Sequence, residues 1–394
     1  MFALSKIYSS KEELETNNLR CWLELNLTTI KNNVEKIRSI ISDKIELMCV
    51  LKASGYGFGS ITTSNYLSSI GIKYFAVATL QEALDLRIHG KITGEILILS
   101  WTPTSEKETL IKYNITQTLI DYDYAKKLND LPGIVKCHIK VDTGMNRIGH
   151  KINDVDIFKK MFELKNLNIT GIYSHLCRVR EFGEEPDDYT KMQISNFDTI
   201  IQQLEKEGYN LGFKHIMSSL GILRCDNSKY NMFRSGILLY GINPDPLNEQ
   251  MENIFNKNDI KPAASLKCKV MSVKIIEKGE KVGYGSKYIA NEKTKIGTIT
   301  IGYADGFPYA CSNNQFNVII KGYLCPIVGN VCMDCTIVKL PMESDIQEGD
   351  IVTIFGKDDN GKFVNYKEFF SKTGTPYEET ICRFGHRITR IYHL

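Results

Sequence analysis

The chain has 394 residues, more than one compact domain usually holds, which predicts either two domains or one large α/β barrel with an addition. Lysine and arginine (49) exceed aspartate and glutamate (46) by only three charges, so we expect no nucleic-acid or anionic-membrane partner and a small substrate. Hydrophobic residues make up 43% and charged residues 24%, which excludes extended disorder, collagen-like repeats and long coiled coils.

The N-terminal segment MFALSKIYSSKEELE becomes charged early and lacks the apolar core and cleavage site of a secretory signal. The apolar stretches of the chain are too short to span a membrane. Eleven cysteines at irregular spacings are more typical of buried thiols in a reducing compartment than of a disulfide framework. We therefore expect a cytoplasmic enzyme without membrane attachment.

Short β-branched runs alternate with amphipathic segments through the first part of the chain. Eight of these runs are expected to be strands, namely residues 47–52, 74–78, 95–99, 117–121, 135–142, 168–174, 213–218 and 236–241. Between them, the segment 154–164 (DVDIFKKMFEL) carries an apolar stripe and predicts a helix. Eight strand–helix units are typical of a (β/α)₈ barrel, with a doubly wound open sheet as the alternative, since the runs do not prove closure.

The character of the sequence changes after Tyr240. A break rich in Pro, Asn and Asp (GINPDPLNEQ) precedes a polar, helix-like piece. From Ala264, alternating runs such as SLKCKVMSVKII and KIGTITIGYA are divided by Gly, Asn and Asp turns, which predicts a mainly-β domain. We expect a barrel over residues 1–256 and a C-terminal β-strand domain over residues 257–394.

Several predicted barrel strands end in polar or charged residues, at the end where barrel enzymes place their reactive groups. Lys52 directly follows the apolar CVL, and it is either a cation that reaches solvent or a desolvated amine suited to a Schiff base. Each of the other polar positions, taken alone, is explained as a structural His, a serine turn or a surface Arg. Together on one face of the barrel, they indicate a functional site. These are the segment Lys140 to Arg147, His175, and Ser218 with Ser219, together with Arg234, which precedes the eighth run, and Gly236, which opens it.

Gly and Ser after the last two strands are suited to a phosphate-binding site, because backbone N–H groups must approach the anion closely. A strand-end lysine together with a phosphate-binding site suggests pyridoxal phosphate (PLP), whose ring nitrogen commonly forms a hydrogen bond with an Asp or an Arg. Arg234 is the expected partner of that nitrogen.

The segment VLKASGYGFG resembles the PLP-attachment segment of the bacterial alanine racemases. Further segments resemble that family in the same order along nearly the whole chain: KVDTGMNRIG, GIYSHL, HIMSSLG, NMFRSGILLYG, VGYGSKY, TIGYADGF, VGNVCMD and PYEE. The resemblance implies a fold of barrel plus β-domain and the racemisation of alanine, which provides D-alanine for peptidoglycan.

The resemblance assigns two catalytic bases, Lys52, which carries PLP, and Tyr284, supplied across a dimer interface. Two bases suit inversion, because the proton leaves one face of a planar carbanion and returns to the other. A tyrosine is a poor base at neutral pH, so cationic neighbours must favour its phenolate, and His175 and Arg234 match the family residues of that network. Since a guanidinium keeps its proton, Arg234 should leave the pyridine nitrogen unprotonated, which favours racemisation over transamination.

The resemblance implies roles for the remaining site residues as well. The residues that hold the cofactor are expected to be Lys52, Tyr56, His175, Ser219, Arg234, Gly236, Ile237 and Tyr377. Arg147 and the backbone near Met333 would receive the substrate carboxylate. Supporting residues would be Lys140, whose carbamate would orient Arg147, Tyr303, which narrows the entrance with Tyr377, and Asp334.

The sequence departs from the commonest family pattern at Phe58, Asn146, Ser218 and Cys335. The segment LCRVREFGEEPDD after His175 resembles serine racemases of glycopeptide resistance, whereas Tyr377 favours alanine, so a serine or broad-spectrum racemase remains an alternative. Further alternatives are a PLP-dependent decarboxylase of basic amino acids, which would place a carboxylate where Arg234 stands, and a PLP carrier protein, which would lack the β-domain and Tyr284.

The pair Cys332 and Cys335 has the C-x-x-C spacing of a metal half-site. No second pair lies nearby, and three-residue spacing in a β-run would point the side chains to opposite faces, so we expect no metal. We expect a head-to-tail homodimer with shared active sites if Tyr284 comes from the neighbouring subunit.

Overall fold

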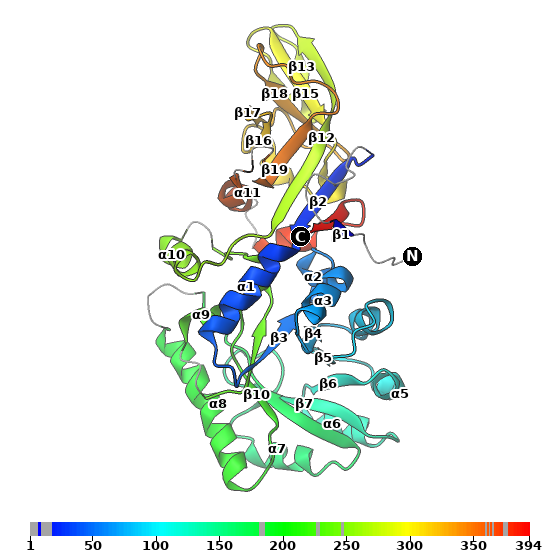
Figure 1. The fold of residues 1–394 in the computed structure, drawn as a ribbon, viewed down its shortest axis with the longest axis vertical. Coiled ribbons are helices and arrows are strands. Elements are labelled where there is room, and N and C mark those ends of the chain that lie inside the picture. Colours follow the sequence, from blue (N-terminus) through cyan, green and yellow to red (C-terminus); the bar gives the residue numbers. More distant parts are fainter. Residues whose placement is uncertain are drawn as a thin grey trace. The chain divides into compact units, whose positions relative to one another are not determined.

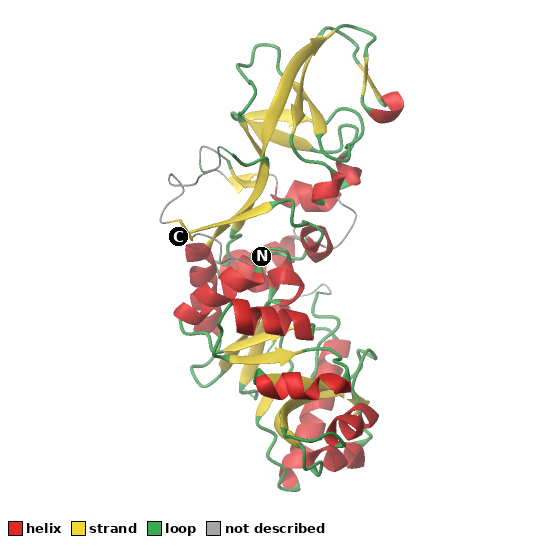
Figure 2. Ribbon diagram, turned by 90° about the vertical axis from the view of Figure 1, so that its right-hand side faces the viewer, coloured by secondary structure: helices red, strands yellow, loops and turns green. Residues whose placement is uncertain are grey.

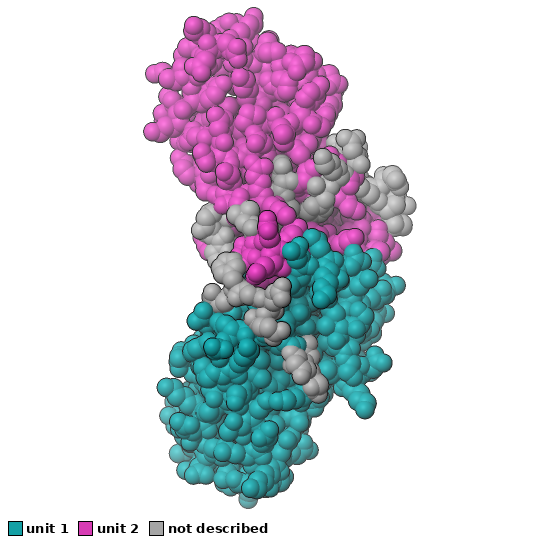
Figure 3. Space-filling view, turned by 90° about the vertical axis from the view of Figure 1, so that its left-hand side faces the viewer, with its two compact units in different colours: residues 1–4, 31–242, 253–260 teal, residues 5–30, 243–252, 261–394 magenta. Residues whose placement is uncertain are grey.

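The structure is a computed structural model that describes residues 7–8, 18–180, 186–225, 229–245, 248–358, 361, 363–364, 366–372 and 377–394. The chain forms two compact units (Figure 3). The first unit contains residues 31–242 and 253–260, and the second contains residues 5–30, 243–252 and 261–394. No helix in these described ranges combines the length and the apolar character needed to cross a membrane.

The first unit is a nearly closed parallel barrel with helices outside the strands (Figures 1 and 2). The parallel order around the barrel is β10-β9-β7-β6-β5-β4-β3-β11. The strands are β3 (Glu46–Val50), β4 (Tyr74–Val77), β5 (Glu95–Ile98), β6 (Ile115–Leu119), β7 (Val135–Asp142), β9 (Leu167–Tyr173), β10 (Phe213–His215) and β11 (Met232–Ser235). Between β10 and β11 the amide of Arg234 donates to the carbonyl of Met217 at 3.1 Å, which joins the two ends of the sheet. The expected α/β barrel is confirmed.

The eighth predicted strand, residues 236–241, is wrong. Those residues form a 3₁₀ turn (Ile237–Tyr240) that ends at Gly241 with a left-handed φ of 66°, and the strand β11 lies just before it. All four turn residues are buried. A short, fully apolar run looks the same in sequence whether it folds as a buried strand or as a buried turn, which explains the error.

Helices follow the barrel strands. They are α3 (Ser60–Ser69), α4 (Leu80–Leu84), α5 (Lys107–Lys112), α6 (Tyr122–Asn129), α7 (Val155–Phe162), α8 (Asp188–Lys206) and α9 (Ser219–Arg224). Their starts carry side-chain caps where the sequence offers them: Asp121 accepts from the amide of Tyr124 at 2.7 Å, and Asp187 accepts from the amide of Thr190 at 2.7 Å. The helix predicted over 154–164 is confirmed as α7, which buries Phe158 and Met161.

The second unit is rich in strands. Its main sheet runs β1-β21-β2-β12-β19-β16-β17, with β15, β18 and β20 attached at the sides. Its strands are β1 (Ile7–Tyr8), β2 (Cys21–Asn26), β12 (Ala264–Ile276), β13 (Lys281–Val282), β14 (Tyr288–Ile289), β15 (Thr294–Ile299), β16 (Asn317–Ile320), β17 (Tyr323–Pro326), β18 (Thr336–Leu340), β19 (Ile351–Lys357), β20 (Phe363–Val364) and β21 (Thr389–His393). The helices α11 (Tyr366–Lys372) and α12 (Tyr377–Cys382) belong to this unit.

The N-terminal segment lies with the second unit, although the sequence suggested that it belongs to the barrel. Strand β2 pairs antiparallel with β12, and Leu23 lies opposite Leu266. This pairing joins residues more than two hundred positions apart, so local sequence pattern gives no sign of it. The helices α1 (Leu27–Ile40) and α10 (Glu249–Lys257) run across the boundaries between the two units. The division at residues 256 and 257 remains a prediction.

Candidate active site

A pocket of about 350 Å³ opens at the carboxyl ends of the barrel strands. Eight of the residues expected from sequence line it together: Lys52, Tyr56, Lys140, Arg147, His175, Ser219, Arg234 and Gly236. They come from the ends of five different strands or the loops that follow them. Ile237 is buried directly after Gly236 and does not line the pocket.

Lys52 follows β3 and begins a turn of unusual handedness. Residues 53–56 all have left-handed backbone angles, with φ of 52° at Ala53 and 56° at Tyr56. Such angles cost residues other than glycine about 1–2 kcal/mol each, so other contacts must hold them. The carboxylate of Glu82 supplies such contacts, because it accepts from the amide of Ala53 at 2.7 Å and from the amide of Ala78 at 2.8 Å.

Tyr56, Gly236 and Ser219 form a tight group on one side of the pocket. The amide of Gly236 donates to the hydroxyl of Ser219 at 3.0 Å. A Cβ atom at position 236 would lie 2.3 Å from the phenol oxygen of Tyr56, so only glycine permits this approach. Phe58 is fully buried and stacks on Tyr240 with ring centroids 4.5 Å apart, which gives this departure from the family pattern a packing role.

Arg234 is buried and held by several acceptors. Its guanidinium donates to Nδ1 of His215 at 2.6 Å, to Nδ1 of His175 at 3.2 Å and to the carbonyl of Ser174 at 2.7 Å. Nε2 of His215 in turn lies 3.0 Å from Nδ1 of His138. Because a guanidinium only donates, Nδ1 of His215 must accept, so its proton is on Nε2 and points to His138.

The electrostatics agree with this assignment. Burial first, and then the charge of Arg234, lower the pKa of His138 to about 3 and the pKa values of His175 and His215 well below their usual range. All three imidazoles are therefore neutral near pH 7. Burial lowers the pKa of Arg234 to about 10, which leaves its guanidinium charged there.

Lys140 and Arg147 bring further positive charge to the pocket. Burial, and next the charge of Arg234, lower the pKa of Lys140 to about 7, so a substantial neutral fraction exists at neutral pH. Asp142, at the end of β7, accepts from the amides of Gly144 and Asn146 at 3.0 and 2.9 Å and shapes the loop that leads to Arg147. Asn146 has a φ of 54°, which asparagine tolerates better than most side chains.

The other predicted site residues lie in the second unit. Tyr284 begins a 3₁₀ turn after β13 and is 75% exposed, and its carbonyl accepts from the side-chain amide of Asn330 at 2.9 Å. Tyr303 and Met333 are also exposed. The carboxylate of Asp334 accepts from Arg387 at 2.7 Å. Tyr377 begins α12, but its side chain lies outside the described part of the structure.

The orientation expected for Cys332 and Cys335 is wrong. These residues do not lie in a β-run but on either side of a two-residue turn, where the amide of Cys332 donates to the carbonyl of Cys335 at 3.0 Å. Their thiols are neighbours. Within the described ranges, no group of three or more His, Cys, Asp or Glu side chains is placed to hold a metal ion.

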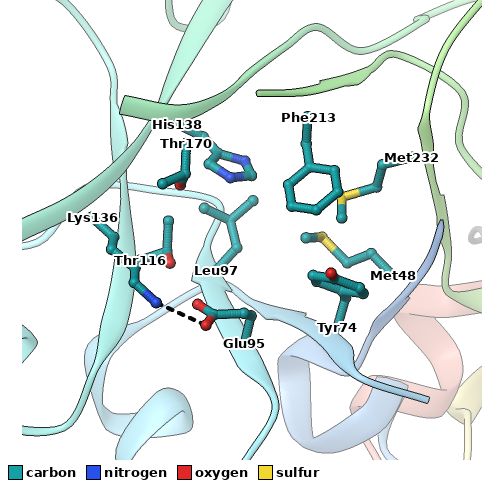
Figure 4. Close-up of a pocket in the computed structure, with 10 residues that line it drawn as sticks. All are labelled: Met48, Tyr74, Glu95, Leu97, Thr116, Lys136, His138, Thr170, Phe213 and Met232. Atoms are coloured by element: carbon teal, nitrogen blue, oxygen red, sulfur yellow. Dashed lines mark hydrogen bonds and ion pairs between the residues drawn. The ribbon is translucent and has the colours of Figure 1, made fainter. Parts of the chain in front are cut away.

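A second pocket of about 200 Å³ lies at the amino end of the barrel strands (Figure 4). Met48, Leu97, Phe213 and Met232 give it an apolar wall, and an ion pair of 2.8 Å between Lys136 and Glu95 lies beside them. His138 also lines this pocket, so the hydrogen-bonded series His138, His215 and Arg234 runs through the barrel interior from one pocket to the other.

Sequence reasoning missed Glu82, His138 and His215. Thr79 and Glu82 form a capping box, and that spacing could have drawn attention to Glu82. His138 and His215 lie within predicted strands, where a histidine has no spacing signal of its own.

Comparison with known proteins identifies the family. Residues 25–244 match the family model described as alanine racemase, N-terminal domain, and residues 263–392 match that described as alanine racemase, C-terminal domain. The chain belongs to the alanine racemase family. An alanine racemase from Methanococcus maripaludis is 36% identical over 377 residues, which cover 94% of this chain and 98% of that protein.

Two further relatives of this alanine racemase family member bear on fold and substrate. The structure of alanine racemase from Clostridium difficile 630 superposes with a TM-score of 0.86 at 31% identity, covering 94% of this chain and 95% of that one. A protein from Enterococcus gallinarum named serine/alanine racemase is 32% identical over 93% of this chain, which spans 50% of that protein. The comparisons confirm the expected enzyme class, an amino-acid racemase.

Proposed function

We propose that this chain interconverts L-alanine and D-alanine with PLP held in the pocket at the carboxyl ends of the barrel strands. The observation that carries this proposal is the group of basic side chains Lys52, Lys140, Arg147 and Arg234 around one pocket, among whose described lining residues none is acidic. Such a pocket suits a phosphate and a substrate carboxylate together. The reaction would supply D-alanine for peptidoglycan precursors, and we propose the cytoplasm as its location.

The residues present fit PLP at three points. Ser219, Tyr56 and the backbone of Gly236 form a close cradle that a Cβ at position 236 would fill, and this supports their role at the phosphate, with Ile237 and Tyr377 as further members. Arg234 would donate to the ring nitrogen, and His175 would help to orient that guanidinium. Lys52 would hold the cofactor through its amine. When bound, PLP withdraws electrons from Cα of the amino acid, so that its proton can leave.

The chain's own groups would then move one proton between two faces. The amine of Lys52 and the phenol oxygen of Tyr284 would take and return the Cα proton on opposite sides, because inversion at carbon needs an acceptor on one face and a donor on the other. Arg147 and the backbone at Met333 would receive the carboxylate. A carbamate on Lys140 would hold Arg147 in place, and the lowered pKa of Lys140 supports this because only the neutral amine reacts with carbon dioxide.

Arg234 also favours racemisation over the alternative chemistries. A decarboxylase strengthens electron withdrawal with a carboxylate at the ring nitrogen, whereas a buried guanidinium cannot supply a proton there. Its hydrogen bonds to two neutral histidines support a fixed donor rather than a proton source. A carrier protein would have no need of the second unit.

A homodimer with shared sites follows from the proposed role of Tyr284. A catalytic tyrosine that is 75% exposed in its own chain would be supplied to the barrel of a partner subunit. Tyr303 and Tyr377 would narrow the entrance and favour a small side chain, with Asp334 supporting this region. Serine is the second candidate substrate, since a relative named serine/alanine racemase aligns along 93% of the chain.

Chiral chromatography of L-Ala, L-Ser, L-Lys and L-Arg, each incubated with purified protein and PLP, tests the proposal. We expect D-alanine as the dominant product and no D-isomer from Lys52→Ala protein. Comparable or greater D-serine would move the substrate to serine. Absence of any D-isomer while cofactor is bound would refute the racemase and favour a decarboxylase or carrier.

A further inference from the structure

Cys332 and Cys335 are paired across the turn formed by Met333 and Asp334. The amide of Cys332 donates to the carbonyl of Cys335 at 3.0 Å. Residues paired in this way extend their side chains on the same face. Burial first, and then the adjacent Cys332 thiol, raise the pKa of the Cys335 thiol, so the two sulfur atoms are neighbours.

The separation of such a pair is close to that of a disulfide. Directly opposed residues have Cβ atoms about 4.5–5.5 Å apart, whereas a disulfide holds them about 3.5–4.5 Å apart. A bond between Cys332 and Cys335 therefore needs a closure of roughly 1 Å. Both residues are partly exposed, so a small oxidant can reach them.

We propose that Cys332 and Cys335 form a reversible disulfide that lowers the activity of the enzyme under oxidising conditions. The oxidant is a small organic disulfide such as oxidised glutathione. One cysteine thiolate attacks it, forming a mixed disulfide and releasing one small thiol. The other thiolate then displaces the second small thiol, so the protein loses two protons and two electrons while one reagent disulfide is reduced to two thiols.

The turn between the cysteines is bonded to a neighbouring backbone segment, so a movement of the turn also moves that segment. The carbonyl of Cys332 accepts from the amide of Tyr303 at 3.0 Å, and the carbonyl of Met333 accepts from the amide of Ala304 at 2.9 Å. A Cβ atom on Gly302 would lie 2.4 Å from both carbonyl oxygens, so the two segments are in close contact. Closure of the turn therefore displaces both Met333 and Tyr303.

The loss of activity rests on the proposed function, in which the backbone at Met333 receives the substrate carboxylate and Tyr303 lines the entrance. A displacement near 1 Å at a positioning group can lower the rate by about a hundredfold. The side chain of Arg387 and that of Arg20 hold Asp334 through its carboxylate and its carbonyl, at 2.7 and 2.6 Å, and they oppose any compensating shift of the turn.

The test treats the PLP-loaded protein with oxidised glutathione, maps the disulfides by peptide mass and measures racemisation before and after reduction. We expect a link between Cys332 and Cys335, a fall in activity of at least about tenfold, and recovery after reduction. Linking should speed up as pH rises, because the raised pKa of Cys335 limits its thiolate.

A protein that carries both Cys332→Ser and Cys335→Ser is the matched control, because it can form neither the link nor a mixed disulfide at this turn, and it should keep the activity of the reduced parent when oxidant is added. Background reaction is removed by replacing the two exposed cysteines, Cys177 and Cys382, with serine in every protein compared. Persistence of two separate thiols, glutathione attached without a link, or a linked protein of full activity would each overturn the proposal. Failure of the proposed function would look different from these outcomes. The disulfide between Cys332 and Cys335 would still be detected by peptide mass, but the reduced protein would produce no D-amino acid.

Discussion

The guanidinium of Arg234 donates to Nδ1 of His215 at 2.6 Å and thereby fixes which nitrogen of that imidazole carries the proton. The opposite nitrogen of His215 then donates to His138, at 3.0 Å, inside the barrel. One charged side chain thus sets the protonation of two buried rings.

Replacement of His138 should reveal this series. His138→Leu removes the acceptor of the His215 proton and leaves a buried donor unsatisfied, which should lower the free energy of unfolding by about 1–3 kcal/mol. The matched control is His138→Asn, whose side-chain oxygen can replace Nδ1 and should recover part of the loss. Urea denaturation of the three proteins checks this, and equal stability of the Leu and Asn variants would show that the hydrogen bond contributes nothing.

Glu82 should be needed for the position of Lys52. Glu82→Ala removes the acceptor for the amide of Ala53 at the start of the left-handed turn, so racemase activity should fall by at least about tenfold and stability by about 1–3 kcal/mol. Glu82→Gln keeps one acceptor oxygen and should be intermediate. Gln81→Ala, one residue away and directed to Asp85, serves as the control in steady-state assays. Full activity of Glu82→Ala would show that this carboxylate is not needed to position Lys52.

Lys140 should make stability depend on pH in a defined direction. Its pKa is about 7 in the folded chain and near 10.5 when unfolded, so between these values the unfolded chain binds more protons and stability rises with pH. Below pH 7 the full cost of charging the buried amine is present. Lys140→Met should therefore be more stable than the parent, most clearly at pH 6 and less so toward pH 10. Urea denaturation across this range in carbon-dioxide-free buffer measures the difference, and a gap that does not narrow with pH contradicts the shift.

Subunit mixing tests the shared site. Lys52→Ala and Tyr284→Phe proteins are each expected to be inactive, but hybrid dimers would contain one site with both bases. An equal mixture with random exchange should regain about a quarter of the parent activity. Subunit exchange must be verified independently, for example by mass tags. No recovery after verified exchange would place both bases in one subunit.

The sequence predicted those parts of the fold that local patterns encode. The β-branched runs of β3 to β10 stand out because parallel strands buried on both faces are nearly all apolar. The run 236–241 misled because a buried 3₁₀ turn has the same composition, and strand β2 was placed in the wrong unit because its partner, β12, lies far along the chain.

The candidate site shows the same limit. Lys52 stands out at the end of a predicted strand, where charge interrupts an apolar pattern, and Arg234 stands out as a charge directly before an apolar run. The role of Glu82 depends on a backbone conformation that no motif announces, and the contact of His138 with His215 depends on the register of strands distant in sequence. The facing thiols of Cys332 and Cys335 required knowledge of a turn where the sequence suggested a strand.

The backbone bond that joins β11 to the chain after β10 has a consequence for exchange with solvent. The amide of Arg234 closes the barrel, while the side chain of the same residue faces the candidate cofactor site. A ligand that binds only the closed barrel and contacts this guanidinium must, by thermodynamic linkage, disfavour breaking of the hydrogen bond made by the amide of Arg234. Deuterium uptake at the amide of Arg234 therefore reports on occupancy of the pocket. A bound ligand would stabilise the barrel at the hydrogen bond that closes it.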